Sequence, residues 1–438
     1  MYPTVVGGLI LRMGLAVVLA PAGEFMFFHH RLLQAESGWQ QLSRFRWLLT
    51  NGYATFPPEK VALLHRHGSR LFFYFWFNGF YEWEARQSMP DGDWRREILE
   101  RHRDWLLNPE QGEQGGGATA PAYFFDFTRP ELRQFLAYTL AAHRRRTGYD
   151  GVFFDYAGSY PLPLAIARRH QERHPEIPYD AAGALFLQAV RAMDPRLLIF
   201  TNQAYRAAEH LLPYTDLDVA ESLATSWLGG REVELFAEGE GWIRTCETFY
   251  RPWEGIQAYY TDILAKVRRF NPRVRFLTIN YLKAFWEPTG ATVIREGRAY
   301  PVYRRRPDRA AAFYGYVAAK LFGLDSYSSD WYDLGSGEDE VFLTRLGRPQ
   351  GGGPELQGSL VVRYFDRGLV ALTATEQGGR ATLPPQRLPE GLKGLRDLYE
   401  RRTIPASREQ CRLEIPPTVS PVSGSTYPAG RVYRYIRP

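Results

Sequence analysis

The fold is predicted from one stretch, Gly148-Tyr149-Asp150-Gly151-Val152-Phe153-Phe154-Asp155-Tyr156. Its apolar part shows no alternation, which is typical of a short strand buried on both faces. Asp155 stands where this apolar run stops. In a parallel barrel the carboxyl end of a strand is where side chains meet a substrate, so Asp155 is a candidate catalytic group. The alternative is a loop aspartate that only hydrogen-bonds its own backbone.

Strand and helix patterns alternate along most of the chain on both sides of this stretch. Helical patterns lie between eight apolar runs, at residues 44–50, 70–77, 122–126, 151–155, 197–202, 217–221, 275–280 and 323–328. Most of these runs end in a polar residue: Asn78, Asp126, Asp155, Asn202, Glu221 or Asn280. A (β/α)8 TIM barrel explains this regularity, because the carboxyl ends of all its strands share one rim. A doubly wound open sheet is the rival fold, but the glycine-rich phosphate motif that it usually carries is missing.

The pattern changes after about residue 340. Short β-favouring runs at 341–346, 359–365, 369–374 and 432–436 replace the helical periodicity, and Asp366-Arg367-Gly368 is a hairpin signal between two of them. The sequence therefore predicts an α/β protein with three parts. These are a signal peptide at 1–23, a (β/α)8 catalytic barrel at 24–339, and a small antiparallel β-sandwich domain at 340–438.

The first 23 residues are an apolar segment that ends in Ala20-Pro21-Ala22, a small-x-small cleavage pattern. Arg12 interrupts the segment, and the part after it is too short to span a bilayer. We interpret it as an export signal, so a secreted or periplasmic bacterial protein is expected. The alternatives are a mis-set start codon or an N-terminal strand of the fold, and without a signal the location would be cytoplasmic.

The composition gives no sign of a metal, another cofactor or a nucleic acid partner. The 438 residues include 54 basic and 48 acidic residues, and only five of the basic residues are lysines. The arginines are scattered, and their densest runs, at 144–146 and 304–306, are interpreted as solvated faces. The two cysteines are far apart and the histidines lack metal-ligand spacing. We therefore predict no cofactor, no nucleic acid partner and no stable membrane insertion; the sequence indicates no oligomeric state.

Two carboxylates on the predicted rim suit the cleavage of a glycosidic bond. That reaction needs one carboxylate that stays ionised and one carboxyl whose raised pKa lets it protonate the leaving oxygen. Asp155 after the fourth strand and Glu221 after the sixth are separated by one strand, so they could face each other across the barrel mouth. We expect Asp155 to be the nucleophile or stabilising carboxylate and Glu221 the general acid/base. Asp126, Asp150 and Asp218 are weaker candidates, and Asp150, which precedes its strand, is expected to be structural.

Aromatic and amide side chains follow the same strands. Flat sugar faces stack on aromatic rings while the sugar hydroxyls bind amides and carboxylates, although packing in the core or a loop is the alternative for any one ring. The residues expected to bind substrate are Asp126, Tyr156, Asn202, Trp227, Asn280, Tyr281, Asn78 and Trp331. Trp76, Trp83 and Trp286 belong to the same predicted aromatic rim.

Two segments resemble a known family. Phe-Phe-Asp-Phe-Thr-Arg-Pro-Glu-Leu-Arg-Gln-Phe at 124–135 and Gly-Tyr-Asp-Gly-Val-Phe-Phe-Asp at 148–155 are similar to motifs of bacterial TIM-barrel proteins classed as glycoside hydrolases, especially the endo-α-1,4-polygalactosaminidase-like group. Residues 73–79 resemble their second strand. The resemblance implies a TIM barrel over about residues 44–330, with Asp155 as the catalytic aspartate and Glu221 as a proton donor. The long loop at 81–120 and the β-domain depart from that group, so the sugar is not implied.

Together these features predict a glycoside hydrolase that cleaves a poly- or oligosaccharide, with a retaining mechanism preferred. One alternative is a carbohydrate-binding protein whose barrel has lost catalysis. The other is an arginine-rich binding module for anionic polymers, whose binding would depend steeply on salt.

Overall fold

The computed structural model describes residues 25–28, 36–50, 55–115, 118–159, 161–283, 285–328, 341 and 344–437. The export signal expected at 1–23 and the expected substrate-binding residue Trp331 lie outside these ranges.

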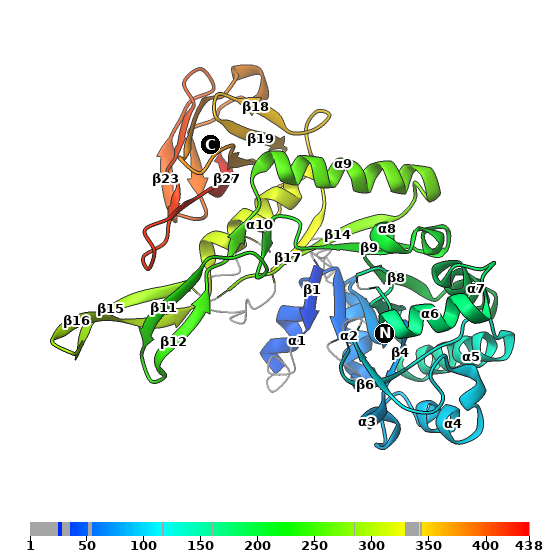
Figure 1. Cartoon of the computed structure of the whole chain (residues 1–438). Helices are drawn as coiled ribbons and strands as arrows, with labels where there is room; N and C mark the ends of the chain where they lie inside the picture. The colour runs from blue at the N-terminus through cyan, green and yellow to red at the C-terminus, as the bar shows by residue number, and fades with distance from the viewer. Residues whose placement is uncertain are drawn as a thin grey trace, which may run out of the picture.

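The central element is an eight-stranded, wholly parallel sheet. Its strands, in spatial order, are β1 (Phe25–Phe28), β2 (Trp47–Thr50), β3 (Arg70–Trp76), β7 (Gly151–Asp155), β8 (Leu198–Asn202), β9 (Leu217–Glu221), β14 (Arg275–Asn280) and β17 (Asp325–Ser328). The two outer strands, β1 and β17, contact each other, so the sheet curls into a barrel. Figure 1 shows this barrel, with β1 in dark blue close to the label of β17 and with β8, β9 and β14 in green. The predicted (β/α)8 barrel is confirmed.

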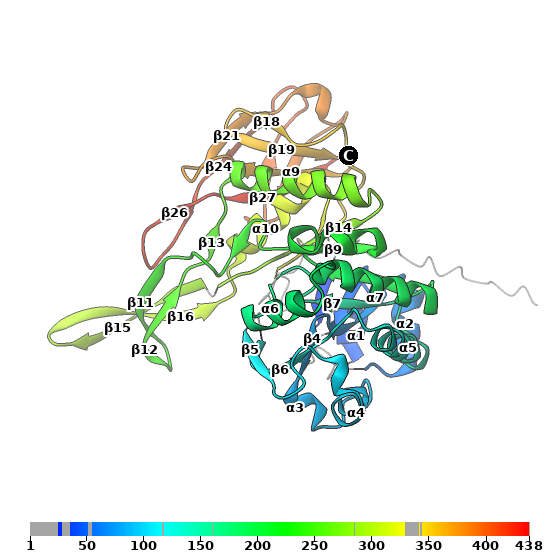
Figure 2. The ribbon, with the colours of Figure 1, turned by 45° about the vertical axis from the view of Figure 1, so that its right-hand side comes forward.

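Helices follow the strands and cover the outside of the barrel (Figures 1 and 2). They are α1 (Glu36–Leu42), α2 (Pro58–Arg66), α5 (Pro130–Thr147), α6 (Leu164–Arg173), α7 (Tyr179–Met193), α8 (Ala204–Ala207), α9 (Trp253–Phe270) and α10 (Arg309–Phe322). Proline fits the first turn of a helix because its missing N–H would have no partner there, and α2 and α5 both begin with it. Gly148 ends α5 in the left-handed conformation that glycine adopts most readily.

The alternation of side chains along the barrel strands separates two layers of packing. Phe153 and Phe200 face the interior, where their ring centroids lie 4.9 Å apart. Phe154, one residue further along β7, points the other way and packs against Phe186 of α7 at 5.7 Å. Both faces of the strands are therefore buried, which explains why the sequence shows continuous apolar runs there.

Two predicted strand assignments need correction. Residues 122–126 do not form a barrel strand: they overlap β6 (Ala118–Phe124), which pairs antiparallel with β4 (Gly79–Tyr81) and β5 (Glu113–Gly115) in a separate sheet. The first barrel strand is instead β1, which the sequence did not predict. The two errors cancel in the count, so β7 and β9 remain the fourth and sixth barrel strands.

A four-stranded sheet that the sequence did not predict projects from the barrel. It consists of two hairpins, one inserted after β9 and one after β14: β11 (Glu232–Ala237) with β12 (Gly241–Cys246), and β15 (Phe285–Arg295) with β16 (Arg298–Arg306). We call it the insertion sheet. It extends away from the barrel in both views (Figures 1 and 2). The short segments α3 (Glu82–Ala85), α4 (Trp94–Arg101), β10 (Thr225–Ser226) and β13 (Phe249–Tyr250) complete the barrel insertions.

The C-terminal region is an antiparallel β-sandwich, as predicted. One sheet has the order β18 (Glu355–Gln357), β19 (Leu360–Phe365), β20 (Gly368–Thr373), β27 (Gly430–Ile436), β22 (Gly394–Asp397) and β23 (Arg402–Pro405). The other pairs β21 (Gly379–Thr382) with β24 (Arg412–Ile415), and a short hairpin joins β25 (Thr418–Val419) to β26 (Thr426–Tyr427). The strand predicted at 341–346 is not formed in its described residues: Val341 is helical and 344–346 are irregular.

The sandwich packs against helix α10 of the barrel through β20 and β27. Gly430 makes this close approach possible, because a Cβ atom there would lie 2.9 Å from the Cα of Tyr314. In the part of the chain that the structure describes, no helix is both long and apolar enough to cross a membrane.

Candidate active site

Asp155 and Glu221 are the last residues of β7 and β9, with β8 between them. Both side chains are partly exposed at the carboxyl end of the barrel. The register places Trp76 opposite Asp155 and Ile279 opposite Glu221. Residues opposite each other in neighbouring parallel strands share one face, so both carboxylates lie on the interior side of their strands.

Asn202, the last residue of β8, connects the two carboxylates. Its Nδ2 donates to Oδ1 of Asp155 and to Oε1 of Glu221, each at 2.8 Å. The two accepting oxygens can therefore lie no farther apart than twice this length. Asn202 is only 2% exposed. If its amide were turned over, Oδ1 would face two carboxylates and be repelled, so Nδ2 must be the atom that points at them.

Each carboxylate has further donors of its own. The hydroxyl of Tyr74 donates to Oδ2 of Asp155 at 2.7 Å, and the backbone N–H of Tyr156 donates to Oδ1 at 2.8 Å. The amide of Gln203 donates to Oε2 of Glu221 at 3.2 Å. Glu221 also accepts a hydrogen bond from the side chain of Tyr281, which is half-buried. All of these bonds favour the ionised carboxylates.

These hydrogen bonds lower the pKa of each carboxyl, whereas burial raises it, and burial has the larger effect on both groups. Burial raises the pKa of Glu221 to about 7, and the negative charge of Asp155 adds to the rise. Burial also raises the pKa of Asp155, while the bonds from Asn202 and Tyr74 oppose it. Two carboxyls in one site, one of which holds its proton near neutrality, are an acid and base pair of the kind that glycosidic bond cleavage uses.

The three neighbouring strands end in the same unusual backbone conformation. Tyr156, Gln203 and Ser222 follow β7, β8 and β9 directly, and their φ angles are 59°, 55° and 58°. This left-handed conformation costs a non-glycine residue about 1–2 kcal/mol, so it persists only where the surroundings hold it. The first turn brings the N–H of Tyr156 to Asp155, and the second brings the amide of Gln203 to Glu221. The third turn, at Ser222, redirects the chain just after Glu221.

A buried polar residue supports each of these turns. Asn78 donates to the backbone oxygen of Tyr156 at 2.8 Å. The Asp218 carboxylate accepts the N–H groups of Ala204 and Tyr205, both at 3.1 Å, just after Gln203. Burial raises the pKa of Asp218 to about 7.

Asn280 supports the third turn. Its Oδ1 accepts the N–H groups of Ala224 at 2.9 Å and Thr225 at 3.3 Å, just after Ser222. The side chain is fully buried. Asn78 and Asn280, both expected to bind substrate, are thus occupied in holding the turns that carry the site.

Trp227 and Asp126 are two further residues that the sequence predicts to bind substrate. Trp227 is 41% exposed, and the ammonium of Lys283 lies 5.8 Å from its ring centroid. Asp126 is fully buried between β6 and α5, where it accepts from the hydroxyl of Thr128 at 2.5 Å and contacts His174 at 3.1 Å. Asp126 therefore anchors the entry to α5, and the structure does not bring it to Asp155 and Glu221.

Sequence reasoning missed two residues that contact the carboxylates, Tyr74 and Gln203. A signal for Tyr74 was present: its hydroxyl is the only hydrogen-bonding side chain in the apolar run 71–75, and a buried hydroxyl needs a partner. Gln203 carried no comparable signal, because its position depends on the left-handed turn after β8.

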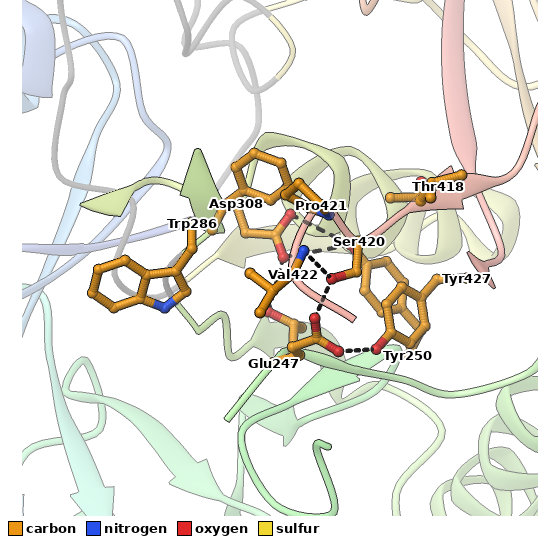
Figure 3. A pocket seen from close by; sticks show the side chains of 12 residues that line it. Glu247, Tyr250, Trp286, Asp308, Thr418, Ser420, Pro421, Val422 and Tyr427 are labelled. Atoms are coloured by element: carbon orange, nitrogen blue, oxygen red, sulfur yellow. Dashed lines mark hydrogen bonds between the residues drawn. The ribbon is translucent and has the colours of Figure 1, made fainter. Parts of the chain in front are cut away.

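A second pair of carboxylates lies where the insertion sheet meets the β25–β26 hairpin (Figure 3). Glu247 accepts the hydroxyls of Ser423 at 3.0 Å and Tyr427 at 2.6 Å, and Asp308 accepts that of Thr248 at 2.9 Å. The cavity beside them has a volume of about 30 Å³, which holds water but not a sugar ring. Glu247 joins the barrel to the C-terminal region, whereas Asp308 also caps α10 by accepting the N–H of Ala311 at 2.9 Å. Among the described residues, no group of three or more His, Cys, Asp or Glu side chains is placed to hold a metal ion.

The chain matches no protein-family model, and no curated protein matches it in sequence. It is similar in structure to the glycoside hydrolase domain of PelA from Pseudomonas aeruginosa, with a TM-score of 0.43 and 18% identity over 70% of this chain and 94% of that one. It is also similar to the noncanonic maltogenic alpha-amylase AmyB from Thermotoga neapolitana, with a TM-score of 0.47 and 11% identity over 95% and 96% of the two chains. An alpha-amylase from Lactobacillus plantarum gives 0.46 and 10% over 93% and 99%. These likenesses are loose, so we infer the activity from the two carboxylates.

Proposed function

We propose that the protein is a glycoside hydrolase that cleaves a poly- or oligosaccharide, with Asp155 as nucleophile and Glu221 as general acid/base. The observation that carries the proposal is the single amide of Asn202, which donates to both carboxylates at 2.8 Å. Retaining glycosidases hold their carboxyl groups ~5–5.5 Å apart, and inverting ones ~6.5–9.5 Å. The short bridge supports the retaining geometry.

The pKa values support the division of roles. In the first step Asp155 attacks the anomeric carbon, the bond to the leaving oxygen breaks, and Glu221 gives that oxygen its proton. With a pKa of about 7, about half of the Glu221 carboxyls carry a proton at neutral pH, and the protonated share grows as the pH falls. In the second step Glu221 takes a proton from water, the hydroxide attacks the anomeric carbon, and Asp155 leaves. The sugar is released with its configuration retained.

The arginine-rich alternative has less support. In the run at 304–306, Arg304 pairs with Glu238, and Arg306 pairs with Glu287 at 3.0 Å. Arg144 in the other run pairs with Asp194 at 3.0 Å. These guanidinium groups are partly neutralised, which weakens a continuous basic surface for an anionic polymer. An exported location is a further proposal, which rests on residues 1–23 alone.

Release of reducing ends tests the proposal. Poly-α-1,4-galactosamine, amylose, chitosan and mixed-linkage β-glucan are incubated with the wild-type protein and with Asp155→Asn and Glu221→Gln. We expect one polymer class to be cleaved, and each substitution to lower kcat at least about a thousandfold. Asp104→Asn and Glu131→Gln, at exposed positions, are the matched controls and should keep full activity. Cleavage that survives both site substitutions would refute the assignment, and binding of a polymer without cleavage would favour the inactive binding protein.

A further inference from the structure

A continuous row of aromatic rings leads away from Asp155 on the side of β3. Trp76 lies opposite Asp155 in the parallel register, and the ring of Tyr156 packs 5.5 Å from that of Trp76. Tyr81 follows at 4.6 Å from Trp76, and Trp83 lies 6.0 Å beyond Tyr81 with an interplanar angle of 17°. The row ends at the surface, because Trp83 is 42% exposed.

A buried network of hydrogen bonds and ion pairs fixes the segment that carries Trp83. Glu84, with only 1% exposure, accepts the backbone N–H of Tyr81 at 2.7 Å. The same carboxylate pairs with the buried Arg95 at 3.4 Å, and Arg95 forms two further bonds to Asp91, at 2.8 and 2.9 Å. Because this network already orders the ring, binding a ligand there costs little conformational entropy.

We propose that Trp83 is a sugar-binding platform, and that the substrate is a saccharide chain long enough to reach from Asp155 to Trp83. The inference rests on the proposed glycosidase function, which it deepens. The near-parallel ring of Tyr81 backs one side of the Trp83 indole, and the exposed part of the indole offers the flat apolar surface on which sugar rings stack. A chain that reaches Trp83 extends beyond the two sugar units that flank the bond being cut.

Trp242 supplies a matched control. It is similarly exposed, at 38%, but lies on the insertion sheet. Its ring meets Phe236 and Tyr300 edge-on, at interplanar angles of 86° and 82°. These contacts do not connect it to Asp155, so its loss tests the general effect of removing an exposed tryptophan.

The experiment measures two quantities on Trp83→Ala, Trp83→Phe and Trp242→Ala, all checked for unchanged melting. The first is KM and kcat on the polymer that the wild-type protein cleaves and on its trisaccharide. For Trp83→Ala we expect KM for the polymer to rise about tenfold, the loss of one stacking contact, with kcat on the trisaccharide unchanged. Trp83→Phe should restore most of the affinity, and Trp242→Ala should behave as wild type.

The second quantity separates this inference from the proposed function. Affinity electrophoresis in gels that contain each of the four polymers reports binding in the Asp155→Asn background, where no cleavage is needed. Retardation that Trp83→Ala abolishes supports the platform, even if the wild-type protein cleaves nothing. The platform is refuted if Trp83→Ala leaves both the polymer KM and the retardation within twofold of the control. It is also refuted if that change affects polymer and trisaccharide equally, or if no polymer retards the protein.

Discussion

Tyr74 and Asp155, on the neighbouring strands β3 and β7, are joined by a hydrogen bond of 2.7 Å from the phenol to the carboxylate. The bond stabilises the charged form of Asp155, which burial alone would disfavour. The proposed nucleophile thus depends on a hydroxyl from the otherwise apolar run 71–75 of β3.

Removing this hydroxyl should lower the fraction of Asp155 that is ionised and loosen its orientation. For Tyr74→Phe we expect kcat to fall about ten- to a hundredfold, the usual effect of losing a hydrogen bond to a charged group. The pKa of Asp155 should rise, so the acid limb of the pH–rate profile should move to higher pH. The comparison is Tyr138→Phe, at a residue that is 59% exposed. An unchanged rate together with an unchanged acid limb would contradict the role given to Tyr74.

Asn202 should matter more, because it serves both carboxylates. For Asn202→Ala we expect kcat to fall at least about a hundredfold, since a donor to each group is lost at once. For Asn202→Asp the loss should be larger at alkaline pH, because a third negative charge then faces the other two. Steady-state rates at pH 5 and pH 8 measure this difference. If the two variants lose the same activity at both pH values, the amide does not bridge ionisable groups in the working enzyme.

The raised pKa of Glu221 predicts the alkaline side of the pH profile. Activity should decline above a pH of about 7, where Glu221 loses the proton that it must donate. A substrate with a dinitrophenolate leaving group needs no protonation, so its first step should not show this decline. Glu131→Gln, at an exposed position, should keep the wild-type profile. The assignment of Glu221 as acid fails if the decline is the same for both kinds of leaving group.

Asn280 should affect stability and turnover, and not substrate binding. Truncation to alanine leaves the buried N–H groups of Ala224 and Thr225 without their acceptor, at a cost of about 1–3 kcal/mol for each unsatisfied group. The turn after β9 should loosen and kcat should fall, with KM unchanged. Chemical denaturation and steady-state kinetics measure the two effects. A rise in KM with normal stability would instead support the direct contact expected from the sequence.

The sequence predicts the barrel well where strands are buried on both faces, because a short continuous apolar run such as 151–155 is typical of such a strand. The same rule fails at 122–126, where an equally apolar run pairs antiparallel with β4 and belongs to a different sheet. An apolar run shows that a strand is buried, and does not show which neighbour it pairs with. The four residues of β1 follow closely after the apolar segment at 1–23, and the run is too short to stand out as a separate strand.

Side-chain direction explains which site residues could be predicted. Asp155, Asn202 and Glu221 end their strands facing inward, and the sequence identified all three as rim residues. Asn280 also ends a strand, but the register pairs Ile279 with Glu221, so Asn280 faces the opposite side. A shift of one residue reverses the direction of a side chain, and only the pairing of strands decides it.

The raised pKa of Glu221 should also make the free energy of unfolding depend on pH, and Glu221→Gln should remove that dependence. Its pKa is about 7 in the folded protein, against an ordinary value of 4.5, so the folded state binds more protons between these two values. Stability should therefore fall as pH rises from about 4.5 to 7, by on the order of 3 kcal/mol from this group. Glu221→Gln cannot lose a proton, so it should gain stability relative to wild type between pH 4.5 and 8. Asp218 titrates in the same range but is present in both proteins, so its contribution cancels. Urea unfolding across this range measures the difference, and parallel curves for the two proteins would mean that Glu221 keeps an ordinary pKa.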